Sequence, residues 1–301
     1  MRVFITGASG HIGSAVVPEL LEADHHVVGL ARSDASAAAL ELAGAEVHRG
    51  DLDDLDGLKQ AAASADGVIH LAFKHEAMRS GDFPGAVGAD LRAIEAIGDA
   101  LEGSDKPFVV TSGTLMLALA GITGRPGTEE DVLEGGPRID SENAAVALAQ
   151  RGVRTSVVRL PPLVHSRRDH DGFVPTLIAI ARHRGFAGYV GDGSNRWPAV
   201  HTLDAARLYR LALEASPAGS RLHGVADEGV PFRDIAQAIG RRLNLPVTAV
   251  APEEAGEHFS FLGVLVSLDN PTSSALTRRW MAWEPTHPGL IEDLGEDHYF
   301  G

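Results

Sequence analysis

Short apolar runs alternate with segments of helical hydrophobic spacing over the first half of this chain. The apolar runs, which predict buried strands, cover residues 2–6, 26–31, 46–49, 67–72, 107–112 and 155–160. The helical segments between them cover residues 11–23, 36–43, 55–64, 87–101 and 143–151. Strands and helices that alternate in this way form a parallel sheet covered by helices on both faces. We therefore expect an α/β fold.

The pattern changes after Pro161 and Pro162. Helical spacing returns at residues 173–183, 203–215 and 232–243, and a strand is predicted at 221–225. Residues 185–197 are instead rich in glycine and aromatic side chains. We expect a large domain of residues 1–160, to which residues 200–226 return, and a smaller C-terminal lobe of residues 161–199 and 227–301.

A glycine-rich loop joins the first predicted strand to the first predicted helix. It reads Gly7-Ala8-Ser9-Gly10-His11-Ile12-Gly13, a Gly-x-x-Gly-x-x-Gly pattern. The first glycine allows a tight turn, the second lets the main chain approach a pyrophosphate, and the third lets the helix pack closely on the sheet. The helix N-terminus then offers free N–H groups to phosphate oxygens. This context predicts a Rossmann-type doubly wound sheet that binds a dinucleotide through Gly7, Ser9, Gly10, His11, Ile12 and Gly13.

The end of the second strand favours NADP over NAD. An NAD site usually places an acidic residue there to bind the ribose hydroxyl, and Ala31 occupies that position. Arg32 and Ser33 follow, and a guanidinium group is well shaped for a 2′-phosphate. Two alternatives stay open: Arg32 is a solvated surface charge, or Asp34 binds the ribose in a shifted register.

The composition of the chain limits the partners that we expect it to bind and the compartment in which we expect it to work. The 301 residues carry a net charge of −15, whereas nucleic acids and anionic membranes bind basic surfaces. Cysteine is absent, and no apolar run approaches the ~20 residues of a membrane span. The first strand begins directly after Met1, so we expect no signal peptide and a cytoplasmic protein. The histidines lack the spacing of metal ligands, which predicts no metal site.

Several short motifs, in their order along the chain, carry a family resemblance. They are the glycine loop, Gly50-Asp51-Leu52, Val68-Ile69-His70-Leu71-Ala72, Val110-Thr111-Ser112, Val158-Arg159-Leu160-Pro161 and Val200-His201-Thr202-Leu203-Asp204-Ala205-Ala206. In these the chain resembles the short-chain dehydrogenase/reductase superfamily. The resemblance is to its extended or atypical branch of epimerase/dehydratase-like and 3β-hydroxysteroid-dehydrogenase-like proteins.

The resemblance implies roles for residues at the ends of strands. Asp51 and Leu52 would contact the adenine, and Leu71, Ala72 and Phe73 would line the cofactor. Ser112 or Thr111 would touch the substrate oxygen, and residues 161–164, with Pro161 and Leu163, would flank the nicotinamide. Related proteins often pair through helices on the sheet face, which leaves a homodimer open for this chain.

The proton donor of that superfamily is missing from this sequence. Its chemistry uses Tyr-x-x-x-Lys, and none of the three tyrosines has a lysine four residues later. The corresponding segment reads Arg138-Ile139-Asp140-Ser141-Glu142. Arginine is a poor acid at neutral pH but stabilises a developing oxyanion. Arg138 and Glu142 are equally well spaced for a structural i,i+4 ion pair.

Other candidates for the donor follow from position. His75 follows the fourth strand and titrates in the range needed for acid–base catalysis, so we assign it, with Ser112 and Arg138, to the catalytic group. Lys74, His165, His201 and Tyr189 are weaker candidates. We expect an NADP-dependent oxidoreductase that acts on a small carbonyl, alcohol or imine-like substrate bound by the C-terminal lobe. A non-catalytic cofactor sensor and an epimerase or isomerase with transient cofactor use are the alternatives.

Overall fold

A seven-stranded parallel sheet forms the centre of the large domain. The computed structural model describes residues 1–300 and, within that range, every side chain except those of residues 78 and 79. The strands are β1 (Arg2–Thr6), β2 (His26–Ala31), β3 (Glu46–Arg49), β4 (Gly67–His70), β5 (Pro107–Gly113), β6 (Arg154–Leu160) and β10 (Ser220–His223). Their order across the sheet is β10-β6-β5-β4-β1-β2-β3, with every neighbouring pair parallel. The predicted Rossmann-type fold is therefore confirmed.

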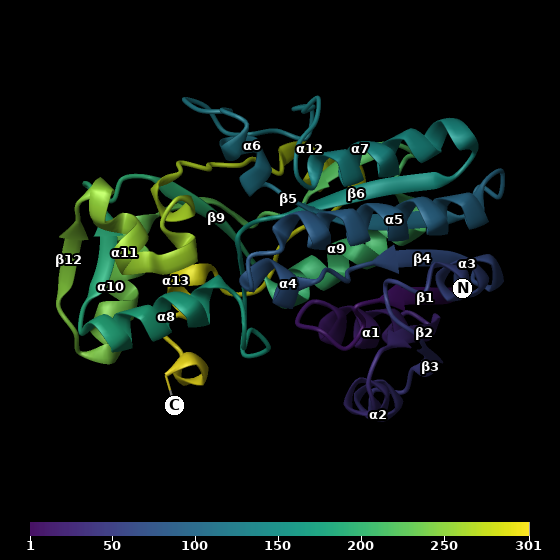
Figure 1. Ribbon diagram of the computed structural model, residues 1–301, viewed down its shortest axis with the longest axis horizontal. Helices are drawn as coiled ribbons and strands as arrows, with labels where there is room; N and C mark the ends of the chain where they lie inside the picture. The colour runs from purple at the N-terminus through teal and green to yellow at the C-terminus, as the bar shows by residue number, and fades with distance from the viewer. Residues whose placement is uncertain (301) are drawn as a thin grey trace.

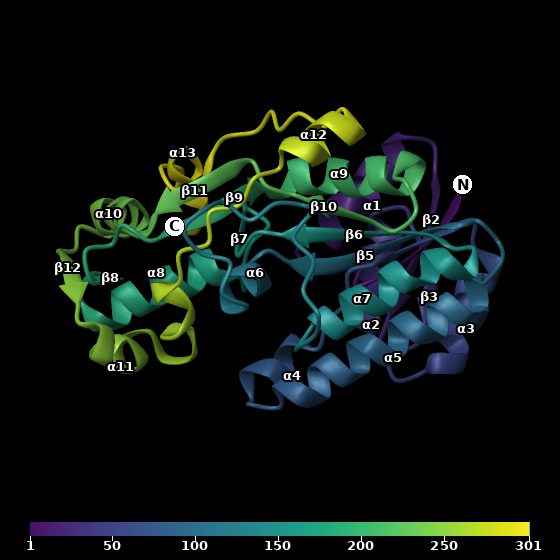
Figure 2. The ribbon, with the colours of Figure 1, turned by 90° about the horizontal axis from the view of Figure 1, so that it is seen from above.

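Helices cover both faces of this sheet (Figure 2). One face carries α1 (Gly13–Glu22), α2 (Asp34–Leu42) and α9 (Thr202–Ala215), which bury Leu20, Leu40 and Leu208 against Val3 and Ile5 of β1. The other face carries α3 (Leu55–Ser64), α5 (Phe83–Leu101) and α7 (Ile139–Ala147), which bury a second apolar cluster. Alternate residues of β1 point to opposite faces, which explains why the strands read as continuous apolar runs.

The C-terminal lobe lies beyond the carboxyl ends of the strands and has its own small sheets (Figure 1). One contains β7 (Leu163–His165), β9 (Arg196–His201) and β11 (Asp227–Pro231), and the other contains β8 (Ala187–Val190) and β12 (Val247–Val250). The helices α8 (Phe173–Arg184), α10 (Phe232–Leu243), α11 (Ala255–Phe259) and α13 (Leu290–Asp293) pack around them. The fully buried Trp197 lies in the apolar core of this lobe.

The lobe departs from the sequence-based expectation at residues 185–197, which form β8 and the start of β9 rather than an irregular loop. Gly188 adds no side chain to the alternation of apolar and polar residues that identifies a strand. Another segment approaches closely at this point, since a Cβ at Gly188 would lie 2.6 Å from His258 Nε2. A strand this short, with a glycine where another segment approaches closely, has no readable alternation. Neighbouring segments therefore determine this strand, through the parallel pairing of β8 with β12.

The remaining elements are short. They are α4 (His75–Arg79), α6 (Leu115–Leu119), α12 (Ala275–Met281) and the 3₁₀ turns at Leu148–Arg151, Pro252–Glu254, Ser260–Leu262, Leu265–Ser267 and Asp297–Tyr299. Both α4 and α6 follow the carboxyl end of a strand, the edge at which open α/β sheets bind ligands. Among the described residues, no helix has the length and apolar character needed to cross a membrane.

Candidate functional site

The glycine loop makes a turn that larger residues cannot enter. Gly7 has φ +70°, and a Cβ there would lie 2.7 Å from the main-chain nitrogen of Ala72. A Cβ on Gly13, the first residue of α1, would overlap the carbonyl oxygen of Gly7. The loop also lies between β1 and β4, where the order of strand connection reverses. Both features are those of a dinucleotide-binding turn.

Free main-chain donors line this turn. Ser9 and Gly10 are exposed, and among residues 1–300 the N–H groups of His11, Ile12 and Gly13 have no protein acceptor. The dipole of α1 adds partial positive charge at the same point. The loop therefore fits a diphosphate, which supplies acceptors for these donors.

Two arginines flank the turn after β2. Arg32 forms a 3.3 Å ion pair with Glu76 of α4, and its side chain is largely exposed. Arg49 Nη1 donates a 2.7 Å hydrogen bond to the carbonyl oxygen of Ser33, and its other amino group pairs with Asp34. Ser33 Oγ caps α2 by accepting from the Ser36 N–H. The sequence analysis missed Arg49, although its place at the end of the strand beside β2 was a usable signal.

The predicted adenine contacts differ in character. Asp51 is exposed, and its Oδ1 accepts from the main-chain nitrogens of Asp53 and Asp54. Leu52 is buried in the core and belongs to the same apolar cluster as Leu30. Lys74 Nζ reaches back from the end of β4 to Asp53 Oδ2, 2.5 Å away. Together with the Arg32–Glu76 pair, this contact ties the segment after β4 to the edge of the cofactor site.

Arg138 reaches the opposite end of the site. Its main chain has φ +62° and immediately precedes α7. Its guanidinium group donates a 2.9 Å hydrogen bond to the carbonyl oxygen of Thr111 and lies 4.2 Å from the centre of the Phe73 ring. The His75 ring packs edge-on against the same phenyl ring, with 5.2 Å between centres. Three residues singled out from the sequence thus meet at the carboxyl ends of β4 and β5.

The two candidate hydroxyls on β5 have different surroundings. Thr111 Oγ1 donates to the carbonyl oxygen of His70 and lies 2.8 Å from the Tyr209 hydroxyl of α9. Ser112 is 6% exposed and lies on the opposite side of the strand, near Glu142. Of the other predicted cofactor contacts, Leu71 and Ala72 are partly buried, whereas Pro161 and Leu163 are buried.

The alternative of a structural i,i+4 pair between Arg138 and Glu142 is not the arrangement found. Glu142 is instead held by Arg159 Nη2 at 2.6 Å and by Arg221 Nε at 2.7 Å. Burial opposes ionisation of this carboxyl, but the hydrogen bonds and charges of the two arginines outweigh burial and hold its pKa below the usual value. Glu142 therefore stays ionised inside the protein, and Arg138 is left to face the cleft.

A buried polar chain fixes the segment after β4. Thr6 Oγ1 lies 2.8 Å from His70 Nδ1, and His70 Nε2 lies 3.3 Å from Asp90 Oδ1 of α5. Burial opposes ionisation of Asp90, yet bonding to His70 and the charge of Arg138 hold its pKa below the usual value. Thr6 also accepts a hydrogen bond from the Ala72 N–H, so this chain sets the approach of Ala72 to Gly7. Sequence reasoning missed Asp90, because it reads as one polar residue of a helix.

Two of the weaker donor candidates are structural. His165 is fully buried, and its Nδ1 lies 2.8 Å from Asp293 Oδ2 of α13. The Tyr189 ring lies under the Arg233 guanidinium, 5.2 Å away, inside the C-terminal lobe. Neither residue lies at the carboxyl ends of β4 and β5.

His201, Asp204 and His287 form a cluster that the sequence analysis missed because their spacing is long. Their potential ligand atoms lie within 4.8 Å of one another. The two imidazole rings stack at an interplanar angle of 9°, so their in-plane lone pairs do not converge. Asp204 already accepts from the main-chain nitrogens of Thr286 and His287 and contacts His287 Nδ1. Hydrogen bonding within the cluster therefore accounts for it.

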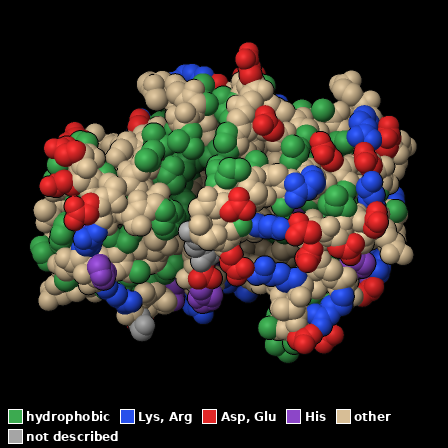
Figure 3. Space-filling model, viewed as in Figure 1, with side chains coloured by type: hydrophobic (Ala, Val, Ile, Leu, Met, Phe, Trp, Pro, Cys, Tyr) green, Lys and Arg blue, Asp and Glu red, His purple; other side chains and the backbone are tan. Residues whose placement is uncertain are grey.

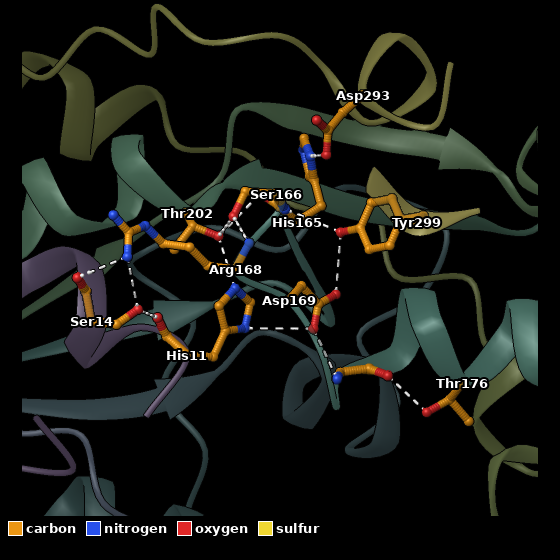
Figure 4. A network of polar contacts seen from close by, with 11 residues as sticks. His11, Ser14, His165, Ser166, Arg168, Asp169, Thr176, Thr202, Asp293 and Tyr299 are labelled. Atoms are coloured by element: carbon orange, nitrogen blue, oxygen red, sulfur yellow. Dashed lines mark hydrogen bonds and ion pairs between the residues drawn. The ribbon is translucent and has the colours of Figure 1, made fainter. Parts of the chain in front are cut away.

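A polar network joins the glycine loop to the lobe (Figure 4). The Thr202 hydroxyl donates to the His165 carbonyl and accepts from Ser166 Oγ, so His11 Nε2, 2.8 Å away, donates to it. His11 Nδ1 then faces Asp169 Oδ1 at 3.6 Å. Burial lowers the pKa of His11 to about 4 and raises the pKa of Asp169 to about 7. A neutral imidazole therefore faces a carboxyl that holds its proton up to near-neutral pH.

The network continues to the C-terminal end of the chain. The Tyr299 hydroxyl accepts from the Ser166 N–H at 3.1 Å and donates to Asp169 Oδ2 at 3.4 Å. Arg168 Nη1 donates to the Ser14 carbonyl of α1 at 3.2 Å. Residues near both ends of the chain thus contact the segment between β7 and α8, which links the cofactor loop to the lobe.

Comparison with known proteins identifies the family. Residues 3–136 match the model of the NAD dependent epimerase/dehydratase family. An uncharacterized protein of Schizosaccharomyces pombe is 49% identical over the whole of both chains. The 2-alkyl-3-oxoalkanoate reductase of Stenotrophomonas maltophilia is 28% identical over 82% of this chain and 77% of its own.

A solved structure shares the architecture as well. A dTDP-glucose 4,6-dehydratase from Streptomyces venezuelae, with NAD and TYD bound, superposes with a TM-score of 0.78 over 98% of this chain and 95% of its own, at 20% identity. A nicotinamide cofactor follows for this chain from the family match and from the glycine loop. Residues 3–136 of the chain therefore belong to the NAD dependent epimerase/dehydratase family, and the protein is an enzyme of the short-chain dehydrogenase/reductase type.

Proposed function

We propose that the protein is an NADP(H)-dependent oxidoreductase that interconverts a small carbonyl compound and its alcohol. The observation that carries the proposal is the position of Arg138, whose guanidinium lies at the carboxyl ends of β4 and β5 beside Phe73. In this fold, that edge of the sheet receives the reacting end of the cofactor. The resemblance to a named 3-oxoalkanoate reductase agrees with a ketone substrate.

The chemistry assigns each residue a limited task. The bound dinucleotide supplies or accepts the hydride, and the carbonyl carbon becomes the carbinol carbon. Arg138 holds the substrate oxygen and stabilises the negative charge that grows on it during reduction. Because a guanidinium keeps its own protons at neutral pH, the proton that completes the alcohol comes from water or from His75.

The preference for NADP rests on the turn after β2. Arg32 and Arg49 are both held around Ser33, and each has a partner that a phosphate would replace: Glu76 for the first and Asp34 for the second. No carboxylate lies at position 31, where NAD enzymes of this fold place one. Two guanidinium groups at one turn suit a 2′-phosphate.

Titration of purified protein with both nucleotides tests this preference. We expect Arg32→Ala and Arg49→Ala each to weaken NADPH binding by about tenfold, which corresponds to ~1.4 kcal/mol, and to leave NADH binding unchanged. Equal weakening for both nucleotides would show that the arginines support the loop rather than read the 2′-phosphate.

The catalytic role of Arg138 is tested by the loss of NADPH absorbance in the presence of ketones. We expect Arg138→Ala to lower kcat/KM by about 10²–10³-fold, the usual effect of removing an oxyanion donor. Arg151→Ala is the matched control, because Arg151 pairs with Asp99 and Glu102 at the surface. If both variants turn over alike, Arg138 is not catalytic.

The missing Tyr-x-x-x-Lys motif would also suit a cofactor sensor without turnover, a role that the enzymes named among the relatives argue against. The same assays separate the two. Tight NADPH binding with no consumption across ketones and aldehydes would select the sensor. Product formed without net change in cofactor absorbance would instead select an epimerase or isomerase.

A further inference from the structure

Two segments without charged residues flank the reacting end of the site. Residues 113–124 contain α6, which follows β5 directly, and residues 259–268 begin at the last residue of α11 in the lobe. Runs of this length without Asp, Glu, Lys or Arg are unusual on the surface of a chain in which 22% of residues are charged. Their shared lack of charged residues suggests that they form parts of one surface.

Hydrogen bonds bring these two segments to the same cleft. Asn270 Nδ2, just beyond the second segment, lies 3.3 Å from Thr114 Oγ1 at the start of α6. The Gly127 N–H donates to the Pro271 carbonyl at 2.8 Å, and the Ser273 N–H donates to the Gly127 carbonyl at 2.8 Å. The chain thus crosses from the lobe to the large domain beside α6 and holds both segments at the cleft.

Each segment buries part of its apolar side chains, such as Leu117 and Leu262, and leaves others exposed. Leu119 of α6 is 48% exposed, Phe261 is 52% exposed and Val264 is 74% exposed. In the space-filling view, hydrophobic side chains gather in a hollowed band between the C-terminal lobe and the large domain (Figure 3). Exposed apolar side chains gathered in such a hollow are typical of a ligand-binding groove.

A cation beside the second segment, Arg196, is already paired with a carboxylate. Arg196 of β9 makes two hydrogen bonds to the Asp269 carboxylate, at 3.0 and 2.8 Å, and its main-chain nitrogen donates to the same group at 2.8 Å. Asp269 comes directly after the second charge-free segment. A phosphate brought to this point would have to displace a fixed carboxylate, so the lobe side of the cleft disfavours anions.

We propose that the substrate is an uncharged ketone or alcohol with a hydrocarbon portion that lies on Leu119, Phe261 and Val264. This inference rests on the proposed oxidoreductase function and adds the substrate class. The reaction remains balanced: hydride from NADPH and one proton from water convert the ketone to a secondary alcohol and release NADP. The Arg196–Asp269 pair offers no free cation to the diphosphate of a sugar nucleotide, which disfavours that class of substrate.

Displacement of an uncharged fluorescent probe tests the substrate class. Nile red is added to the full-length protein saturated with NADPH and is displaced by a series of ketones from 2-butanone to 2-decanone. Because each buried methylene contributes about 0.8 kcal/mol, we expect displacement to strengthen about three- to fourfold for each added methylene. UDP-glucose and dTDP-glucose are expected to leave the signal unchanged at millimolar concentration.

Several outcomes would overturn the inference. They are a ketone series with no dependence on chain length, no binding of Nile red, and displacement by a sugar nucleotide at lower concentration than by 2-decanone. NADPH binding is measured in the same samples by its fluorescence. A protein that does not bind NADPH refutes the proposed function, whereas one that binds NADPH but fails the ketone series refutes only the substrate class.

Surface variants locate the groove. We expect Phe261→Asp and Val264→Asp each to weaken Nile red binding by about tenfold and to leave NADPH binding unchanged. Leu42→Asp is the matched control, because Leu42 is 91% exposed on α2, outside both segments. If Phe261→Asp and Val264→Asp bind the probe as the original protein does, the groove is elsewhere and the proposal is wrong.

Discussion

The two ends of the cleft use different parts of the polypeptide. At the cofactor end, main-chain N–H groups of the glycine loop face the ligand, and ion pairs such as Lys74–Asp53 tie the neighbouring segments together. At the lobe end, exposed apolar side chains such as Phe261 form the surface. The first end therefore depends on the path of the backbone, and the second depends on which side chains are present.

This difference shows which substitutions each end of the cleft tolerates. A diphosphate site made by main-chain groups tolerates many side chains but few changes at glycine, because any Cβ alters the path. A groove made by side chains changes its ligand with each substitution. Arg138 lies at the carboxyl ends of β4 and β5, where its guanidinium is held by the Thr111 carbonyl and the Phe73 ring.

The largest effect is expected at the buried ion-pair network of the large domain. Glu142→Ala would leave Arg159 and Arg221 buried without their carboxylate, and losing one partner of a buried pair costs about 3–5 kcal/mol. We expect a decrease of that size in the free energy of unfolding, measured by urea denaturation. Glu102→Ala, which removes the exposed partner of Arg151, should leave the urea midpoint nearly unchanged. Similar costs for both would contradict the buried role of Glu142.

A pair of glycine substitutions tests whether the main-chain turn at the cofactor end binds the nucleotide. Gly7 and Gly103 have nearly the same φ, +70° and +68°, but a Cβ at Gly7 would meet Ala72 at 2.7 Å whereas nothing lies within 4 Å of one at Gly103. Both alanine variants carry backbone strain of about 1 kcal/mol. Only Gly7→Ala should also weaken NADPH binding, by at least about tenfold in fluorescence titration. Equal NADPH binding by the two variants would show that the tight turn is not the binding element.

The smallest effect concerns the Asp169 network between the two ends. The pKa of Asp169 is raised from 3.8 to about 7, so the folded protein favours its protonated form. The associated stability is fully present below pH 3.8 and is lost as the pH rises through about 7. An amide side chain does not ionise and avoids this loss. The variant Asp169→Asn should therefore be more stable than the original protein at pH 8, by about 1–3 kcal/mol.

Thermal unfolding over a pH series measures this effect. The difference between Asp169→Asn and the original protein should shrink toward zero as the pH falls to about 4. His11 and His201, whose pKa values burial lowers to about 4, titrate in both proteins and largely cancel in the difference. Asp234→Asn, which changes an exposed aspartate of α10, is the control. A pH-independent difference would show that Asp169 is ionised throughout.

Much of the large domain could be predicted because its signals are local. The first three strands and α3 and α10 have the predicted bounds, since apolar runs and helical periodicity need only a few neighbouring residues. The start of α5 at Phe83 was missed by four residues, because Pro84 and Gly85 hide its first turn, which Asp82 caps. The extent of β4 was overestimated for a related reason: Leu71 and Ala72 are apolar but belong to the cofactor edge.

The residues of the site were predicted less completely than the elements of the fold. Gly7, Arg32, Phe73 and Arg138 were singled out from the chain, but Arg49 and Asp90 were not. Helical spacing offered Arg138 as one alternative partner of Glu142, whereas Arg221, which binds it, lies 79 residues away. Spacing along a helix says which residues share a face, and it does not say what another strand brings to that face.

The amino-acid sequence alone determined the order of strands and helices and the glycine turn, because both depend on steric and periodic rules that act over a few residues. The tertiary structure decided that Arg138 faces the cleft and that two distant apolar segments border it. It also set the raised pKa of the Asp169 carboxyl. These properties depend on which remote groups exclude water or supply charge at a given point, and the folded chain alone brings such groups together.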